Sequence, residues 1–205
     1  LDVDGHGPFS HLLENTLTNG IHNEEFSLAL MEELNRKLDK ILNLCIDIFK
    51  DKYSKHFLHQ LVSGQLDVDR LDYLRRDSFF TGVTEGNIGS ARIIKMLDLR
   101  NDKLVVEAKG IYSIENFLMS RRLMYWQVYL HKTAVAAEKL LLKTITRAKE
   151  LSNKGIRLFA SPALQFFLEK DVDKYFFENN RNEVLRNFVN LDDNDIWCAL
   201  KVWTG

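Results

Sequence analysis

The stretch QLDVDRLDYLRRDSFFTG, Gln65 to Gly82, alternates charged and apolar side chains. Seven of the eleven residues from Asp67 to Asp77 are charged, yet leucines lie among them and two phenylalanines follow. On a helix that turns 100° per residue, four polar residues fall within an arc of about 100°: Asp69, Tyr73, Arg76 and Asp77. The stretch therefore predicts a helix with one face that carries two carboxylates, a phenol and a guanidinium.

This polar face has two interpretations. As a ligand site, a carboxylate binds a hard cation, a phenol packs on a sugar, and an arginine holds a carboxylate or phosphate. As a structural feature, the same residues form a salt-bridge network on a solvated face, with Asp72 paired to Arg76 and Asp69 paired to Arg70 or Arg76. Composition alone leaves both interpretations open.

A second stripe lies in RRLMYWQVYLHKT, Arg121 to Thr133. Arg121, Tyr125, Tyr129 and Lys132 fall within about 80° of one another on a helix whose other residues are mostly apolar. This arrangement suits an anionic ligand with a flat or sugar-like part. An aromatic core seam with basic ends that reach the solvent would give the same pattern.

The string GHGPFSH, near the start of the chain, places two histidines five residues apart, His6 and His11. Glu14 and His22 follow, and Asp2 precedes the string. Histidines titrate near neutral pH and serve as acids, bases or metal ligands. The string is consistent with a functional cleft and equally with a structural loop.

Composition places the chain among ordinary globular proteins. Its 205 residues are 45% apolar and 28% charged, enough for one domain with a sizeable core. The net charge of −1 gives no general reason to expect nucleic-acid binding. Cys45 and Cys198 lie far apart, which favours a reducing intracellular compartment. Because the chain begins at Leu1, apparently inside a motif, we expect it to be a piece of a longer protein.

The low content of proline and glycine favours helices over a turn-rich β fold. The apolar spacing predicts helices over 24–50 (continuous or broken once), 57–77 (one helix or two), 91–97, 113–151, 163–189 and 196–203, with Asn190 or Asp192 able to cap the last. Asn101-Asp102 before Leu104–Val106 predicts a tight turn and a strand. The expected fold is all-α, with at most one short β-hairpin near 98–112.

Together the strings GHGPFSH, LDVDRLDYLRRDSFFTG and RRLMYWQVYLHKT resemble the HD-domain phosphohydrolases. The resemblance is to their dGTPase-like branch, the deoxynucleoside triphosphate triphosphohydrolases, and it covers about residues 1–150. It implies an all-helical HD core over 1–150, with 151–205 as a C-terminal helical extension of the same domain. It also implies a nucleotide substrate and a homo-oligomer. A cytoplasmic location is expected from the two widely separated cysteines.

The resemblance further implies a role for each matching residue. A divalent metal ion would be held by Asp69 and by Asp2, which stands where the family has its His-Asp doublet. Tyr73 would stack under the deoxyribose and Asp77 would accept a hydrogen bond from its 3′-hydroxyl. The residues expected to complete the substrate site are Arg76, Arg121, Tyr125, Tyr129 and Lys132. The residues expected to contact phosphate or handle protons are His6, His11, Glu14 and His22, with Asn23 as the alternative to His22.

The implied reaction is hydrolysis of a deoxynucleoside triphosphate to the deoxynucleoside and triphosphate. The string Leu1-Asp2-Val3-Asp4 does not contain the family's intact His-Asp doublet. The alternative is therefore a catalytically impaired HD fold that binds nucleotides or serves regulation or assembly.

Overall fold

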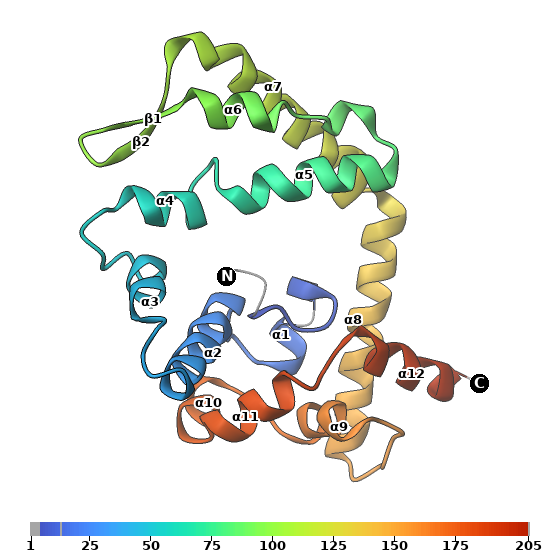
Figure 1. The fold of residues 1–205 in the computed structure, drawn as a ribbon. Coiled ribbons are helices and arrows are strands. Elements are labelled where there is room, and N and C mark those ends of the chain that lie inside the picture. Colours follow the sequence, from blue (N-terminus) through green and yellow to red (C-terminus); the bar gives the residue numbers. More distant parts are fainter. Residues whose placement is uncertain (1–4, 13, 205) are drawn as a thin grey trace. The chain divides into compact units, whose positions relative to one another are not determined.

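Helices and one β-hairpin make up the computed structural model, which describes residues 5–12 and 14–204 (Figure 1). The prediction of an all-α fold with a single short hairpin is confirmed. Contacts divide the chain into two units. Unit 1 combines Leu1–Lys40 with Ala137–Gly205, and unit 2 is the intervening segment Ile41–Ala136. The expected domain division at residue 150 stays a prediction.

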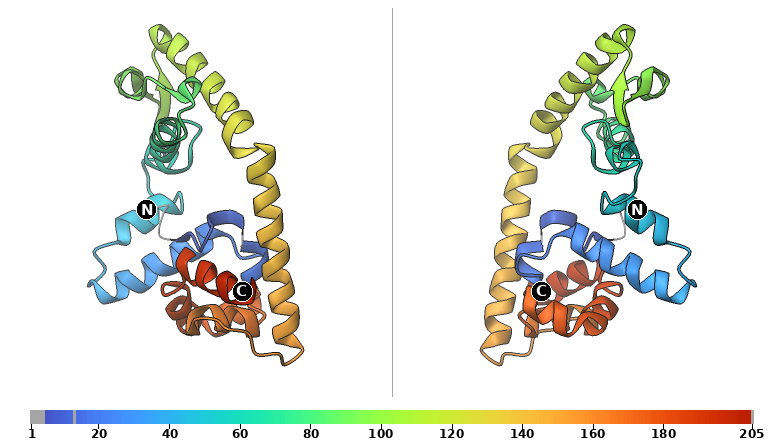
Figure 2. Two further views of the ribbon diagram at one scale, coloured as in Figure 1. Left: turned by 90° about the vertical axis from the view of Figure 1, so that its right-hand side faces the viewer. Right: turned by 90° about the vertical axis from the view of Figure 1, so that its left-hand side faces the viewer.

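Unit 1 is built from both ends of the chain. The 3₁₀ turn Ser10–Leu12 and α1 (Glu14–Leu17) precede α2 (Asn23–Lys37), and most of α8 (Lys132–Asn153) belongs to this unit. The remaining helices are α9 (Pro162–Glu169), α10 (Lys174–Asn179), α11 (Arg181–Phe188) and α12 (Asp193–Thr204). Both views of Figure 2 show these C-terminal helices packed beside α2 and the second half of α8.

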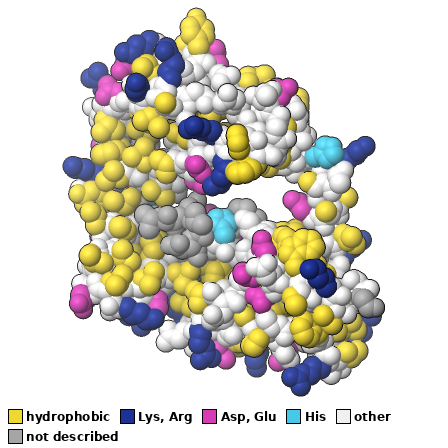
Figure 3. Space-filling model, turned by 45° about the vertical axis from the view of Figure 1, so that its right-hand side comes forward, with side chains coloured by type: hydrophobic (Ala, Val, Ile, Leu, Met, Phe, Trp, Pro, Cys, Tyr) yellow, Lys and Arg dark blue, Asp and Glu magenta, His cyan; other side chains and the backbone are white. Residues whose placement is uncertain are grey.

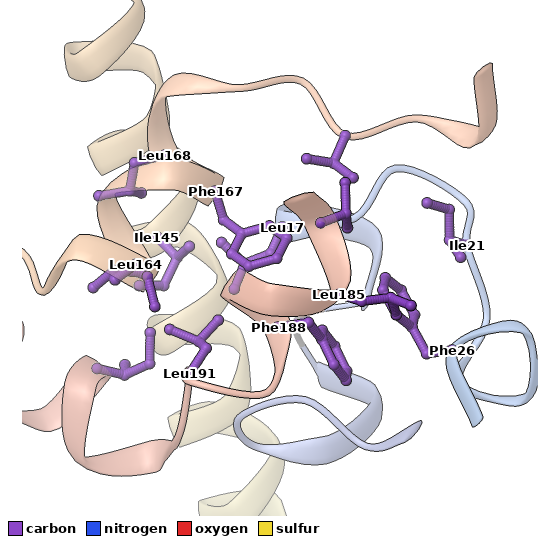
Figure 4. Close-up of a cluster of buried hydrophobic side chains, with 14 of the residues drawn as sticks. Leu17, Ile21, Phe26, Ile145, Leu164, Phe167, Leu168, Leu185, Phe188 and Leu191 are labelled. Carbon is purple, nitrogen blue, oxygen red and sulfur yellow. The ribbon is translucent and has the colours of Figure 1, made fainter. Parts of the chain in front are cut away.

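The core of unit 1 joins the two segments of the chain (Figure 4). Phe26 from α2 stacks on Phe188 from α11, with ring centroids 4.1 Å apart and an interplanar angle of 10°. The ring of Phe177, from α10, lies 5.1 Å from Phe26 on centroids. Leu17 and Ile21 from the N-terminal segment lie in the same cluster as Phe167 from the C-terminal segment. Neither segment alone could bury these rings.

Unit 2 has its own smaller core. Its helices are α3 (Asn43–Phe49), α4 (Phe57–Ser63), α5 (Val68–Thr81), α6 (Ser90–Met96) and α7 (Ile111–Met124). Short 3₁₀ turns cover Thr84–Gly86 and Ala108–Gly110, and a π-helix, Tyr125–Tyr129, follows α7. The buried cluster consists of Leu71, Leu74, Ile88, Ile93, Phe117 and Met124.

The hairpin forms at the position that the turn signal predicts. Strands β1 (Leu97–Arg100) and β2 (Lys103–Val106) pair antiparallel, with Leu97 opposite Val106. Asn101 and Asp102 both have positive φ, 51° and 60°. Two-residue turns with positive φ at both positions match the twist of paired strands, and asparagine and aspartate accept that conformation more readily than most residues.

Four of the predicted helical segments are divided in the structure, and 57–77 forms the two helices α4 and α5. The helix expected over 24–50 is broken once, after Lys37, where Asp39 and Lys40 adopt positive φ. The helix expected over 113–151 gives way to the π-helix after Met124. The segment 163–189 forms α9, α10 and α11. The Asp173 side chain accepts from the Phe176 amide and starts α10 as a new helix. Asp192, as expected, accepts from the first amides of α12.

Among the residues that the structure describes, no helix combines the length and apolar character needed to cross a membrane. Figure 3 shows that hydrophobic side chains nevertheless reach the surface over broad areas of the face it presents, between acidic and basic ones. Exposed apolar surface is common in folded proteins and identifies no site by itself.

The loop between α3 and α4 should respond to pH through one histidine. His56 Nδ1 lies 2.8 Å from Asp51 Oδ1, and this hydrogen bond and charge raise the pKa of His56 above 6.5. The raised folded-state pKa means that the pair stabilises the fold below about pH 6.5 and that this contribution is lost as the pH rises through the folded-state pKa. We expect an NMR titration to place the His56 pKa above 6.5, and Asp51→Asn to lower it. Equal pKa values in the two forms would show that the pair does not form in solution.

Candidate functional site

The sequence of α5 sets the direction of its polar face. Asp67 caps the helix by accepting from the Arg70 amide at 2.7 Å, and its carboxylate also pairs with the Arg70 guanidinium. Gly82, in the left-handed conformation at φ 70°, ends the helix. Leu71 and Leu74 are buried in the core of unit 2, so Tyr73 and Asp77 lie on the adjoining, half-buried side.

A π-helix carries the tyrosines that meet this face. The Leu130 amide donates to the Tyr125 carbonyl at 2.7 Å, an i to i+5 bond typical of π-helical geometry. Within this turn the rings of Tyr125 and Tyr129 lie 5.3 Å apart on centroids at 77°. Single π turns within helices occur frequently at functional sites.

The two stripes predicted from the sequence meet in unit 2. Tyr129 Oη donates to Asp77 Oδ2 at 2.6 Å. The Tyr73 ring lies edge-on to Tyr129, with centroids 6.1 Å apart at 76°. We call Tyr73, Asp77, Tyr125 and Tyr129 the tyrosine cluster. It presents aromatic edges around one oriented carboxylate.

Burial shapes the protonation of the cluster. Burial first, and then the hydrogen bond to Asp77, raises the pKa of Tyr129 far above its ordinary value of 10.0. Burial also raises the pKa of Tyr73. Both phenols therefore stay protonated near neutral pH, and Tyr129 donates its hydrogen bond to Asp77. Arg121 lies at the edge of the cluster, its Cζ 5.8 Å from the Tyr125 ring centroid and its Nη1 donating to Gln65 Oε1 at 3.3 Å.

Arg76, Lys132 and Asp69 do not take part in these contacts. Arg76 is exposed and pairs with Asp72 at 2.8 Å, which is the salt bridge expected under the structural interpretation of α5. Lys132 is exposed at the start of α8. Asp69 lies in the first turn of α5 and is partly buried. Their roles in binding substrate or metal stay predictions.

The GHGPFSH loop lies in unit 1 and is held by several close contacts. Gly5 packs so tightly on α2 that a Cβ atom there would lie 2.2 Å from the Asn23 carbonyl oxygen. The Phe9 amide donates to Asp193 Oδ1 at 2.8 Å, and the Phe9 ring meets Trp197 edge-on at 5.7 Å. His6, between these anchors, is partly buried. The loop has the fixed backbone that a positioned histidine requires.

Beside this loop, Glu14 is bonded to the start of α2. Its Oε1 accepts from the Asn23 amide at 3.3 Å, whereas the His22 side chain is exposed and makes no cap bond. Glu14 and Asn23 line a cavity of about 20 Å³ with Gly7 and Thr18, room for about one water molecule. The pairing of Glu14 with His22 stays a prediction, and the side chain of His11 lies outside the described part of the chain.

A metal ion requires several converging ligands. Within residues 5–12 and 14–204, no three histidine, cysteine, aspartate or glutamate side chains form a group that could hold one. Asp69 is described and contributes one oxygen donor, and Asp2 lies outside the described residues. The described residues therefore do not make up a metal site by themselves, and the assignment of both ligands stays a prediction.

The contacts of two residues near the site, Gln65 and Asp67, were not predicted from the sequence. Gln65 meets Arg121, and Asp67 holds Arg70, which also donates to the Gly64 carbonyl. The role of Asp67 could have been predicted, because an aspartate three residues before a helical amide is a common N-cap. The contact of Gln65 could not have been predicted, since its partner Arg121 lies 56 residues away in the sequence.

The comparisons with known proteins give this arrangement a family context. Residues 88–178 match the HD associated region, a family model that spans α6 to α10 with the π-helix between them. A crystal structure of a phosphohydrolase from Bacteroides thetaiotaomicron superposes with a TM-score of 0.93 at 68% sequence identity, covering 97% of this chain and 49% of that one. The fold is therefore the HD-like phosphohydrolase fold.

Curated relatives extend the comparison. The Bacillus subtilis protein YwfO, uncharacterized, is 32% identical over 97% of this chain and 45% of its own length. A Dictyostelium discoideum homolog of the deoxynucleoside triphosphate triphosphohydrolase SAMHD1 is 24% identical over 71% of this chain and 32% of its own length. The chain is thus a relative of the HD-domain phosphohydrolases, and it spans less than half the length of the curated relatives it matches.

Proposed function

We propose that this chain forms the nucleotide-binding part of a phosphohydrolase that acts on deoxynucleoside triphosphates. The observation that carries the proposal is the tyrosine cluster, in which Tyr129 orients the Asp77 carboxylate at 2.6 Å beside Tyr73. The similarity to a named triphosphohydrolase across 71% of the chain supports the same substrate class.

The cluster has the groups that a deoxyribose requires. One ring packs on an apolar sugar face, and one carboxylate oxygen accepts from the 3′-hydroxyl. We assign the first role to Tyr73 and the second to Asp77. Because Asp77 is already bonded to Tyr129, it is oriented before substrate arrives, which lowers the entropic cost of binding. A ribose 2′-hydroxyl packed against an aromatic ring would lose its hydrogen bonds to water, so the cluster favours deoxyribose.

The proposed reaction breaks one phosphoester bond. A water oxygen bonds to the α-phosphorus, the bond to the 5′-oxygen breaks, and the 5′-oxygen receives a proton, which gives the deoxynucleoside and triphosphate. Arg121 would offset phosphate charge. Proton transfer is proposed for the histidines of the GHGPFSH loop, His6 and His11, with Glu14 and His22. No step is assigned to a metal.

The test uses four deoxynucleoside and four ribonucleoside triphosphates with the purified protein. Triphosphate and free nucleoside are measured by ion-exchange chromatography, and metal content by elemental analysis. We expect triphosphate from the deoxy substrates at rates at least tenfold above those from the ribo substrates. Release of monophosphate, or equal rates for the two sugar classes, would overturn the proposal.

A second candidate function is nucleotide binding without hydrolysis. The favouring observation is that the described residues hold no group of three potential metal ligands. Equilibrium dialysis distinguishes the two. Binding of deoxynucleotides without triphosphate release, unaffected by Asp69→Ala, would establish the binding function.

A further inference from the structure

Two arginines lie beside the tyrosine cluster, and they differ in their partners. Burial raises the pKa of Tyr73, and the charges of Arg121 and Arg70 oppose that rise, so both guanidinium groups lie near this phenol. Arg70 pairs with the carboxylate of Asp67, which neutralises much of its charge. Among the described residues, no carboxylate forms an ion pair with Arg121. Arg121 therefore keeps its charge for an anionic ligand.

The hydrogen-bond partner of Arg121 is a neutral carboxamide. Arg121 Nη1 donates to Gln65 Oε1 at 3.3 Å, and Arg121 Cζ lies 5.8 Å from the Tyr125 ring centroid. A carboxamide oxygen accepts a hydrogen bond and leaves the charge of the guanidinium in place, whereas a carboxylate there would form a competing ion pair. A guanidinium has five N–H groups, so this bond orients Arg121 and leaves most of its donors for a ligand.

Gln65 lies in the short loop between α4 and α5, and this loop is tied to α5 at two points. The Arg70 guanidinium donates to the Gly64 carbonyl, and the Asp67 side chain accepts from the Arg70 amide at 2.7 Å. These bonds lie on either side of Gln65 along the chain and hold its backbone. A side chain on a held backbone orients its partner more closely than one on a mobile loop.

We propose that Gln65 is a positioning residue, which orients the Arg121 guanidinium toward the triphosphate of the substrate and, being neutral, leaves its charge available. The inference rests on the proposed function and deepens it, because the phosphate role of Arg121 belongs to that proposal. Gln65 bonds to Arg121 and acts on the ligand through it. The neutrality of residue 65 is then as important as its ability to accept a hydrogen bond.

Inorganic triphosphate is the probe, because it presents phosphate without sugar or base, and isothermal titration calorimetry measures its dissociation constant. Gln65→Ala removes the acceptor and should raise this constant by about 2- to 10-fold. Gln65→Glu keeps the shape but pairs with Arg121 and repels the anion, so it should raise the constant by at least about 20-fold. The matched control, Gln127→Glu, makes the same exchange at an exposed position of the π-helix and should change it less than about threefold.

Hydrolysis is assayed separately, so that the two proposals fail separately. Gln65→Glu should raise KM by similar factors for deoxy and ribo substrates, because Arg121 meets phosphate and not the sugar, and circular dichroism checks that each variant stays folded.

Three results would overturn the inference, even with a parent chain that hydrolyses deoxynucleoside triphosphates. They are no triphosphate binding by the parent chain, Gln65→Glu binding as tightly as Gln65→Ala, and equal losses in Gln65→Glu and Gln127→Glu. If binding follows the expected order but no substrate is hydrolysed, the role of Gln65 stands and the proposed function alone fails.

Discussion

Asp77→Ala is expected to lower kcat/KM for deoxynucleoside triphosphates by about 10- to 150-fold. This range corresponds to about 1.5–3 kcal/mol, the contribution of a hydrogen bond to a charged group. The variant removes the proposed acceptor for the 3′-hydroxyl and leaves Tyr129 Oη without the partner it now has at 2.6 Å. Initial rates of triphosphate release over a range of substrate concentrations measure the effect.

A dideoxynucleoside triphosphate separates recognition from general damage, because it lacks the 3′-hydroxyl. We expect Asp77→Ala to change hydrolysis of the dideoxy substrate less than threefold. Tyr129→Phe should lower kcat/KM for the deoxy substrate by about 2- to 10-fold. In the double variant with Asp77→Ala it should lower kcat/KM little further, since Tyr129 acts through Asp77. Asp98→Asn, an exposed carboxylate on β1, is the control. Equal losses with both substrates would contradict the assignment.

Phe26→Ala is expected to lower the free energy of unfolding of unit 1 by about 3–5 kcal/mol. Phe26 is 1% exposed and lies between the rings of Phe188 and Phe177. Its removal leaves a cavity where helices from the two ends of the chain meet, and these helices cannot close over it without disturbing one another. Urea denaturation followed by circular dichroism measures the change.

The matched control is Tyr175→Ala, an aromatic residue of the same unit that is 76% exposed. It should change the free energy of unfolding by no more than about 0.5 kcal/mol. Phe26→Leu should recover most of the loss, because it refills much of the volume. If Phe26→Ala and Tyr175→Ala had equal effects, the packing of unit 1 around Phe26 would be refuted.

Periodicity predicts the helices of this chain well, and their interruptions poorly. The apolar repeat continues through residues 113–151, so nothing in the sequence marks the π-helix at Tyr125–Tyr129. The turn at Asn101-Asp102 was readable because only a few residue types accept its backbone angles. The start of α10 at Asp173 depends on one local cap bond, which a repeat of apolar residues cannot reveal.

In the candidate site, too, contacts set by helical spacing were predictable and contacts set by the tertiary fold were not. Tyr73 and Asp77 share a helix face by arithmetic, and that face does meet Tyr129. The spacing of Arg121 and Tyr125 also predicts their contact, at 5.8 Å. The bond of Gln65 to Arg121 and that of Glu14 to the Asn23 amide depend on the tertiary fold or on a loop path, and no helical spacing encodes them.

The order of the two units along the chain has a consequence for biosynthesis. Unit 2, Ile41–Ala136, is inserted between the two segments of unit 1. A ribosome therefore completes the core of unit 2 before it has made Phe167 or Phe188, the partners of the first segment. Domains generally fold as units while the chain is being made. We expect the first 40 residues to emerge long before they can bury Phe26, and to depend on chaperones during that interval.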